Sequence, residues 1–199
     1  VYGYWPGMSD GDDVVVFDPG DIDREIGRFH FPRQSEQNRL CLADYVRAAE
    51  DLADGERDVV ALQLVTTGPR ASERSNSLQR EGLYDDMLRV HGFATQMAEA
   101  TAEYLHQRIR RELRLESEQG RRYSWGYPSC PDLDGHRTLF GIVPAQEIGV
   151  ALTEGFQLVP EQSTAAIVLH HPEARYFAVY TAAAAAEEGA FGAPEPALP

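Results

Sequence analysis

Short segments of the chain carry the branched and aromatic residues that are typical of strands, and turn-forming residues bound each of them. The segments lie at residues 12–18, 27–32, 58–68, 164–170 and 175–180. The segment 58–68 is apolar almost throughout, which predicts a buried strand. The last two alternate between apolar and polar residues on either side of a His-Pro-Glu-Ala turn, which predicts a β-hairpin.

Two other segments show apolar residues at three- and four-residue spacing, which predicts amphipathic helices. The first covers residues 36–53, with Ser35 as N-cap and Gly55 beyond its end. The second covers residues 83–115, and its expected apolar side consists of Leu83, Met87, Val90, Ala94, Met97, Tyr104 and Ile109. Because few β-α-β units appear, the pattern favours an α+β fold over a doubly wound sheet.

The end of the chain differs from the rest in composition. The stretch GAFGAPEPALP is rich in Pro, Gly and Ala, which is typical of a loose tail. We therefore expect one domain over residues 1–183 and a flexible tail over 184–199. The first residue is Val1 rather than methionine, and we expect a piece cut from a longer polypeptide or a processed chain.

Charge and composition exclude several classes of function. The formal net charge is −14, which repels nucleic acid and anionic lipid, so we expect neither as a partner. All basic residues are arginines, which excludes a Schiff-base lysine and a phosphate-binding loop lysine. Cys41 and Cys130 are too few for a disulfide scaffold, and the sequence shows neither a signal peptide nor an apolar run of membrane-span length. A reducing cytoplasm is the expected location.

The usual cofactor and metal motifs do not occur. The stretch LVTTGPRAS lacks the G-x-G-x-x-G of a dinucleotide site, and DGHRTL has Leu139 where the cobalamin-binding D-x-H-x-x-G motif requires glycine. No metal site is expected, because the potential zinc ligands, Cys41, Cys130, His136, His170 and His171, have no recognised ligand spacing.

One stretch, RRYSWGYPSCPDL at residues 121–133, carries more arginine and aromatic side chains than a connector needs. Gly126, Pro128 and Pro131 interrupt both helix and strand patterns, which predicts an ordered loop with a function.

Six stretches in order along residues 1–180 carry a family resemblance: VYGYWPGMSDGDDVVVF, LCLADYV, AEATAEYLHQRIRREL, RRYSWGYPSCPDL, LTEGFQLVPEQST and HHPEARYFAV. Together they resemble the C-terminal activation domain of cobalamin-dependent methionine synthase. The resemblance implies a C-shaped α+β domain, with a central twisted antiparallel sheet flanked by helices, that binds S-adenosylmethionine and remethylates oxidised cobalamin.

The resemblance also implies the residues of the site. The family's ligand contacts fall on Asp44, Glu99, Arg122, Tyr127, Tyr176 and Phe177. A guanidinium suits the ligand's α-carboxylate and an acid its α-ammonium, which matches Arg122 and Asp44.

Four of these residues also have an ordinary structural interpretation. Asp44 could form a surface ion pair with Arg47, and Glu99 could be a solvated helix residue. Tyr176 and Phe177 alternate on an expected strand, so that one would be core. Cys130 fits a buried small hydrophobe better than a nucleophile.

The implied reaction needs no acid, base or other catalytic side chain from this chain. Cob(II)alamin takes an electron from a flavodoxin or similar donor, and the resulting cob(I)alamin attacks the sulfonium methyl group. Cobalamin would be held by another domain, because no cobalamin-binding motif occurs in this sequence. The resemblance implies that this cobalamin-binding domain belongs to the same polypeptide. Two alternatives stay open: a stand-alone module that senses S-adenosylmethionine or docks a partner, and an unrelated methyltransferase.

Overall fold

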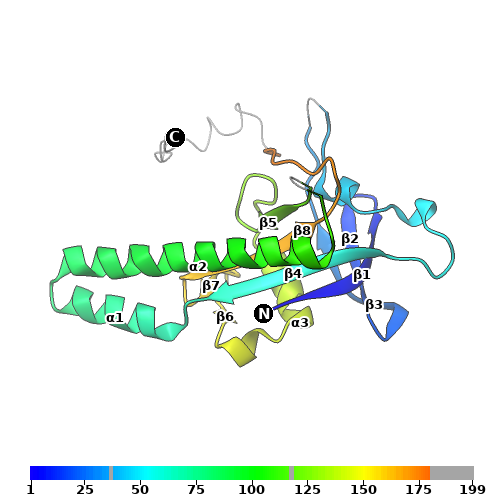
Figure 1. Ribbon diagram of the computed structural model, residues 1–199. Coiled ribbons are helices and arrows are strands. Elements are labelled where there is room, and N and C mark those ends of the chain that lie inside the picture. The colour runs from blue at the N-terminus through cyan, green and yellow to red at the C-terminus, as the bar shows by residue number, and fades with distance from the viewer. Residues whose placement is uncertain (36–37, 117–118, 180–199) are drawn as a thin grey trace.

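The computed structural model describes residues 1–35, 38–116 and 119–179. Its central feature is a six-stranded sheet in which all neighbours pair antiparallel, in the order β3-β2-β1-β4-β8-β5 (Figure 1). The strands are β1 (Tyr2–Asp10), β2 (Asp13–Asp18), β3 (Asp21–His30), β4 (Asp58–Thr66), β5 (Arg121–Ser124) and β8 (Ser163–Leu169). A separate two-stranded ribbon joins β6 (Ala151–Leu152) to β7 (Leu158–Val159).

The strands predicted at 12–18, 58–68 and 164–170 are confirmed as β2, β4 and β8. Residues 27–30 of the predicted segment 27–32 form the end of the longer β3, residues 31 and 32 lie beyond it, and β1 was not predicted. The strand predicted at 175–180 is wrong for residues 175–179, and residue 180 lies outside the described residues. The backbone N–H and carbonyl groups of Phe177 form hydrogen bonds with the side chain of Ser129 instead of with a neighbouring strand. The predicted tail, 184–199, also lies outside the described residues.

Three α-helices accompany the sheet: α1 (Pro69–Arg80), α2 (Tyr84–Glu112) and α3 (Gly135–Ile142). α2 confirms the long predicted helix. α1 was missed because its polar sequence buries little beyond Ser75 and Leu78, although Gly68 and Pro69 mark its start. α1 and α2 form a hairpin that projects from the sheet on the side away from β1–β3 (Figure 1).

The helix predicted over 36–53 is wrong for residues 38–53, and residues 36 and 37 lie outside the described part of the chain. The structure has two short 3-10 helices there, Leu42–Tyr45 and Ala49–Asp51, and extended backbone between them. The residues from Cys41 to Val46 are buried except Asp44, so the core contacts this segment on nearly all sides. An amphipathic helix buries one face only, and the apolar spacing that predicted it is a coincidence.

The two faces of the sheet are covered differently. On one face the main core contains Phe29, Phe31, Leu62, Leu64, Tyr123, Leu139 and Ile167, with α3 packed against β3. On the other face α2 lies across β4 and β8. Of the predicted apolar side of α2, Ala94 and Ile109 are buried, but Leu83, Met97 and Tyr104 are exposed. The helix also buries Ala98, Ala102 and His106, which lie outside the predicted side, and Ile109 packs with Ala61 and Val168 of the sheet.

Across the described residues, no helix has both the length and the apolar character needed to span a bilayer.

Candidate ligand-binding site

The candidate site begins at β5, the edge strand of the sheet. Side chains alternate along β5, so that Tyr123 points into the main core while Arg122 points towards α2, where it meets Glu99. The chain then turns back beside the strand, because Cys130 Sγ donates a hydrogen bond to the Ser124 carbonyl oxygen at 2.9 Å. The loop predicted at 121–133 is therefore a strand for its first four residues and a loop after them.

This loop is anchored by one aromatic ring and shaped by two glycines. Trp125 is 6% exposed, and its ring stacks on Phe29 with the centroids 5.3 Å apart. A Cβ atom on Gly135 would lie 1.9 Å from Trp125 Nε1, so only glycine fits there. Gly126 has a φ of +88°, and its N–H donates to the Cys130 carbonyl oxygen at 2.9 Å. The loop is consequently a fixed part of the site.

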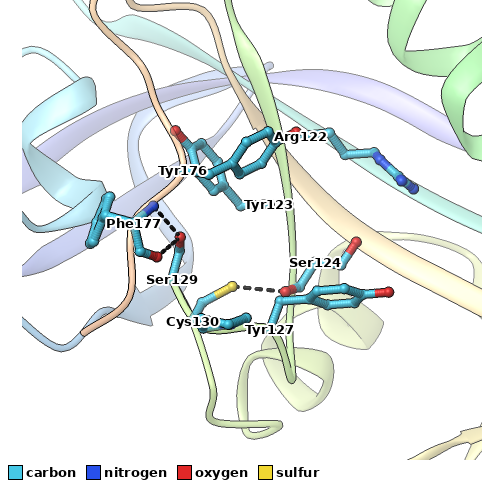
Figure 2. A pocket seen from close by; sticks show the side chains of 9 residues that line it. Arg122, Tyr123, Ser124, Tyr127, Ser129, Cys130, Tyr176 and Phe177 are labelled. Carbon is cyan, nitrogen blue, oxygen red and sulfur yellow. Dashed lines mark hydrogen bonds between the residues drawn. The ribbon is translucent and has the colours of Figure 1, made fainter. Parts of the chain in front are cut away.

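Residues 174–179 form the facing wall. The Phe177 N–H donates to Ser129 Oγ at 3.2 Å, and the Ser129 hydroxyl donates back to the Phe177 carbonyl oxygen (Figure 2). The Val179 N–H donates to the Pro128 carbonyl oxygen at 3.0 Å. These bonds join two segments that are about fifty residues apart in sequence.

Between these walls lies a pocket of about 500 Å³, which is within the usual size range of small-molecule sites. Its lining consists of Arg122, Tyr123, Ser124, Tyr127, Pro128, Ser129, Cys130, Tyr176 and Phe177. Tyr176 is 65% exposed and meets the Tyr123 ring edge-on at 5.5 Å. In Figure 2 the Arg122 guanidinium points away from Tyr176 and Phe177. The pocket therefore has an aromatic side and a cationic side.

The cationic side is held by an ion pair. Arg122 Nη2 donates to Glu99 Oε2 at 2.9 Å, and the Arg122 side chain is 17% exposed. Arg122 Nη1 is buried and has no hydrogen-bond acceptor among the described residues. Glu99 lines a second pocket of about 340 Å³, which shares Ser124 and Tyr127 with the first. The ion pair thus lies where the two pockets meet.

Asp44 lies apart from this pocket lining. Its carboxylate accepts two hydrogen bonds from Arg33, at 2.7 and 2.8 Å, and one from the Cys41 N–H at 2.9 Å. Partial burial opposes ionisation of Asp44, but these hydrogen bonds outweigh it and hold the pKa of the carboxyl below its ordinary value. The ion pair with Arg47 is not formed, because Arg47 binds Glu56 instead.

Of the six residues named from the sequence, the structure brings Arg122, Tyr127, Tyr176 and Phe177 into one pocket. It joins Glu99 to them through Arg122. It leaves Asp44 at a neighbouring position, linked through Tyr45, whose ring stacks on Tyr123. Residues 1–185 match the family described as the activation domain of vitamin B12 dependent methionine synthase. The chain belongs to this family.

The activation domain has relatives of much greater length. It is 42% identical over 200 residues to methionine synthase of Mycobacterium tuberculosis, and 40% identical over 201 residues to that of Mycobacterium leprae. In both cases the alignment covers 90% of this chain and 17% of the relative. The chain therefore spans about one sixth of the length of these relatives.

A solved structure shares the fold of the activation domain. It is a crystal structure of the MetH reactivation domain bound to AdoHcy, with a TM-score of 0.80 and 28% sequence identity. The similarity covers 89% of this chain and 60% of the other. The α+β fold expected from the sequence, with an antiparallel sheet flanked by helices, is confirmed.

Tyr123 and Ser129 are parts of the pocket lining that sequence reasoning missed. Both lie inside RRYSWGYPSCPDL, so strand alternation could have shown Tyr123 beneath the pocket, but the Ser129 contact depends on a distant segment. Burial raises the pKa of the Cys130 thiol to about 12, which fits the small-hydrophobe interpretation. Within the described part of the chain, no three His, Cys, Asp or Glu side chains are grouped as a metal site.

Proposed function

We propose that this domain binds S-adenosylmethionine in the pocket beside β5 and presents its methyl group to a cobalamin held by another domain of the same polypeptide. The observation that carries the proposal is the Arg122 guanidinium at one side of an aromatic pocket, with a buried N–H group that lacks an acceptor among the described residues. An α-carboxylate supplies two oxygen acceptors for such a group.

The rest of the pocket fits the remaining parts of this ligand. The rings of Tyr127, Tyr176 and Phe177 offer flat apolar surface for an adenine and π faces for a sulfonium cation. The bound AdoHcy of the solved relative supports a ligand of this class. The chain's formal charge of −14 also favours a cationic ligand over an anionic one.

Glu99 and Asp44 take different parts in the proposal. Glu99 orients Arg122, because it fixes the guanidinium through Nη2 and leaves Nη1 for the ligand. Asp44 remains the proposed partner of the α-ammonium. Its side chain is 38% exposed, and carboxylate oxygens accept several hydrogen bonds each, so the bonds from Arg33 leave acceptor capacity.

The residues of this chain would bind and orient the ligand and would not transfer protons. The methyl group moves by direct displacement at carbon, with cobalamin as acceptor and a flavodoxin or similar protein as the electron donor that makes cobalamin reactive. Such a step depends on the position of the reacting groups. An open pocket rim at Tyr176 and Tyr127 leaves one side of the bound ligand free for an incoming domain.

Calorimetric titration with S-adenosylmethionine tests the binding step. We expect stoichiometric binding, and we expect Arg122→Ala to weaken it about 30-fold, which corresponds to about 2 kcal/mol for the lost charged hydrogen bonds. The matched control is Arg121→Ala, which removes a neighbouring guanidinium that does not line the pocket. Unchanged affinity in a folded Arg122→Ala domain would remove Arg122 from the site.

Binding without methyl transfer would leave the domain as a sensing or partner-docking module. Transfer to an acceptor other than cobalamin would instead indicate an unrelated methyltransferase. A domain that does not bind S-adenosylmethionine at all would contradict the proposal.

A further inference from the structure

A row of polar residues runs along the flank of α2 that faces Arg122. Glu99, Glu103, His106 and Arg110 follow one another at spacings of four, three and four residues, which places them on one side of the helix. The other buried residues of α2 are Ala94, Ala98, Ala102 and Ile109, so the buried His106 makes this row an exception. His106 is its most buried member, at 6% exposed.

The two ring nitrogens of His106 have different surroundings. Nδ1 lies 3.5 Å from Glu103 Oε2, and a carboxylate oxygen only accepts, so the neutral ring carries its proton on Nδ1. Nε2 is then an acceptor, and it is buried with no donor among the described residues. Burial lowers the pKa of His106, and the guanidinium groups of Arg110 and Arg122 lower it further against the opposing effect of Glu103. The ring is therefore neutral at neutral pH.

Unpartnered donors occur in the same interface. Arg122 Nη1 and Arg110 Nε are both buried without an acceptor in the described chain. Gln63 of β4 lies below this part of α2, where its Nε2 donates to the Ala102 carbonyl oxygen at 3.3 Å and its Oε1 is also unpartnered. Buried groups of this kind are nearly always paired directly or through an internal water. The donors of the two arginines and the acceptors of His106 and Gln63 complement each other.

We infer that His106 is a positioning residue for Arg122: its neutral imidazole accepts a hydrogen bond from the inner N–H of the guanidinium, directly or through one internal water, while Glu99 holds the outer N–H. Nη1 carries two N–H bonds, so one serves His106 and the other serves the ligand. This inference rests on the proposed function, because it assigns His106 a part in binding the carboxylate of S-adenosylmethionine.

Protonation of His106 would abolish this arrangement. The imidazolium has no lone pair, and it would add a third positive charge beside Arg110 and Arg122, with Glu103 as the acid that faces the ring. Gln63, from β4, carries no charge. Arg122 would then lose its inner support, and its contact with Glu99 alone would hold it. Ligand binding should therefore weaken as the pH falls.

The test measures the dissociation constant of S-adenosylmethionine by titration calorimetry from about pH 7.5 to about pH 5, around and below the ordinary histidine pKa. The variants are His106→Gln, which supplies an acceptor that does not titrate, and His106→Leu, which supplies none. The control is His91→Gln, on the same helix but outside the row. Circular dichroism at each pH checks the fold.

We expect the wild type and His91→Gln to lose affinity about tenfold over this range, as for the loss of one charged hydrogen bond. His106→Gln should keep wild-type affinity at neutral pH and vary little with pH. His106→Leu should bind about tenfold more weakly at every pH.

Equal pH profiles for the wild type and His106→Gln would overturn the inference, and this comparison decides the matter even if His106→Leu does not fold. Absence of binding by the wild type at neutral pH would instead contradict the proposed function.

Discussion

The carboxylate of Asp44 connects two parts of the segment between β3 and β4. It accepts a hydrogen bond from the Cys41 N–H at the start of the 3-10 helix Leu42–Tyr45. It also accepts two hydrogen bonds from Arg33, which connect this helix to the residues after β3. We expect Asp44→Asn and Arg33→Gln each to lower the free energy of unfolding by about 1 to 2 kcal/mol, measured with urea. Their effects should be less than additive in the double variant, since the two changes remove one interaction.

The same pair of variants separates the structural role of Asp44 from its proposed role in binding. If Asp44 binds the α-ammonium, Asp44→Asn should weaken S-adenosylmethionine binding several-fold, whereas Arg33→Gln should weaken it little. Equal losses of affinity in the two variants would show that Asp44 acts only by shaping the segment.

At the scale of single residues, the sequence predicted which residues line the pocket better than it predicted which residues bind them. Arg122, Tyr127, Tyr176 and Phe177 follow from motifs, and the structure brings them into one pocket. The partners Glu99 and Arg33 are 23 and 11 residues away from Arg122 and Asp44, and only the tertiary fold joins them. The helical pattern expected over 36–53 suggested Arg47 as the partner of Asp44, and the 3-10 conformation removes that pairing.

At the scale of elements, an ion pair joins the start of β4 to the end of β8. His170 Nε2 lies 2.7 Å from Asp58 Oδ1, and Asp58 also accepts from the Arg47 N–H. The hydrogen bond to Asp58 raises the pKa of His170 above its ordinary value. Burial opposes ionisation of Asp58, but its hydrogen bonds, first that to His170, outweigh burial and lower its pKa.

These shifts define a pH window for the stability of the domain. A raised histidine pKa stabilises the fold below the unfolded pKa of about 6.5, and this stabilisation is lost as the pH rises through the folded pKa. The lowered pKa of Asp58 acts at the acidic end of the pH range. There the stabilisation is lost as the pH falls through the pKa that Asp58 has in the folded state. The pair is therefore most stabilising between these limits.

We expect His170→Gln to lower the free energy of unfolding by about 1 to 2 kcal/mol near about pH 6 and by much less near about pH 9. Asp58→Asn should also remove the loss of stability at alkaline pH, because it removes the carboxylate that raises the pKa of His170. Urea denaturation across this range measures both variants. An alkaline slope in His170→Gln as steep as that of the wild type would assign the dependence to other groups.

Strands that bury a continuous apolar surface were predicted well, as β2, β4 and β8 show, whereas α2 was predicted in its extent but not in the side that it buries. Elements stabilised by particular contacts were not. α1 packs mainly on α2 and has no apolar stripe of its own, and residues 175–179 are held by Ser129 and Pro128. Local sequence carries no signal for such partners, which lie far away along the chain.

At the scale of the molecule, the domain is a sheet with a helical hairpin on one face and the site at one sheet edge (Figure 1). The chain covers 17% of its mycobacterial relatives, so the proposed reaction depends on parts outside it. We expect the domain to transfer label to cobalamin when it is supplied with a cobalamin domain, a reductant and methyl-labelled S-adenosylmethionine. Transfer should be faster when the two domains are linked, because linkage raises the effective concentration.

Two controls accompany this experiment. Label transfer should fall to background without the cobalamin domain and in Arg122→Ala. Label that appears on another molecule in the absence of cobalamin would contradict the proposed reaction while leaving ligand binding intact.

The buried position of Trp125 also gives the domain an optical reporter. The sequence contains two tryptophans, and Trp5 lies on β1, which β4 and β8 separate from β5. Trp125 follows Arg122 by three residues and precedes Tyr127 by two, with its ring against Phe29. Replacing Trp5 with phenylalanine would leave one fluorophore, inside the binding loop. Because Trp125 lines the second pocket together with Glu99 and Tyr127, its emission should respond when a ligand binds beside it, so that rates of ligand arrival and departure become measurable without any attached dye.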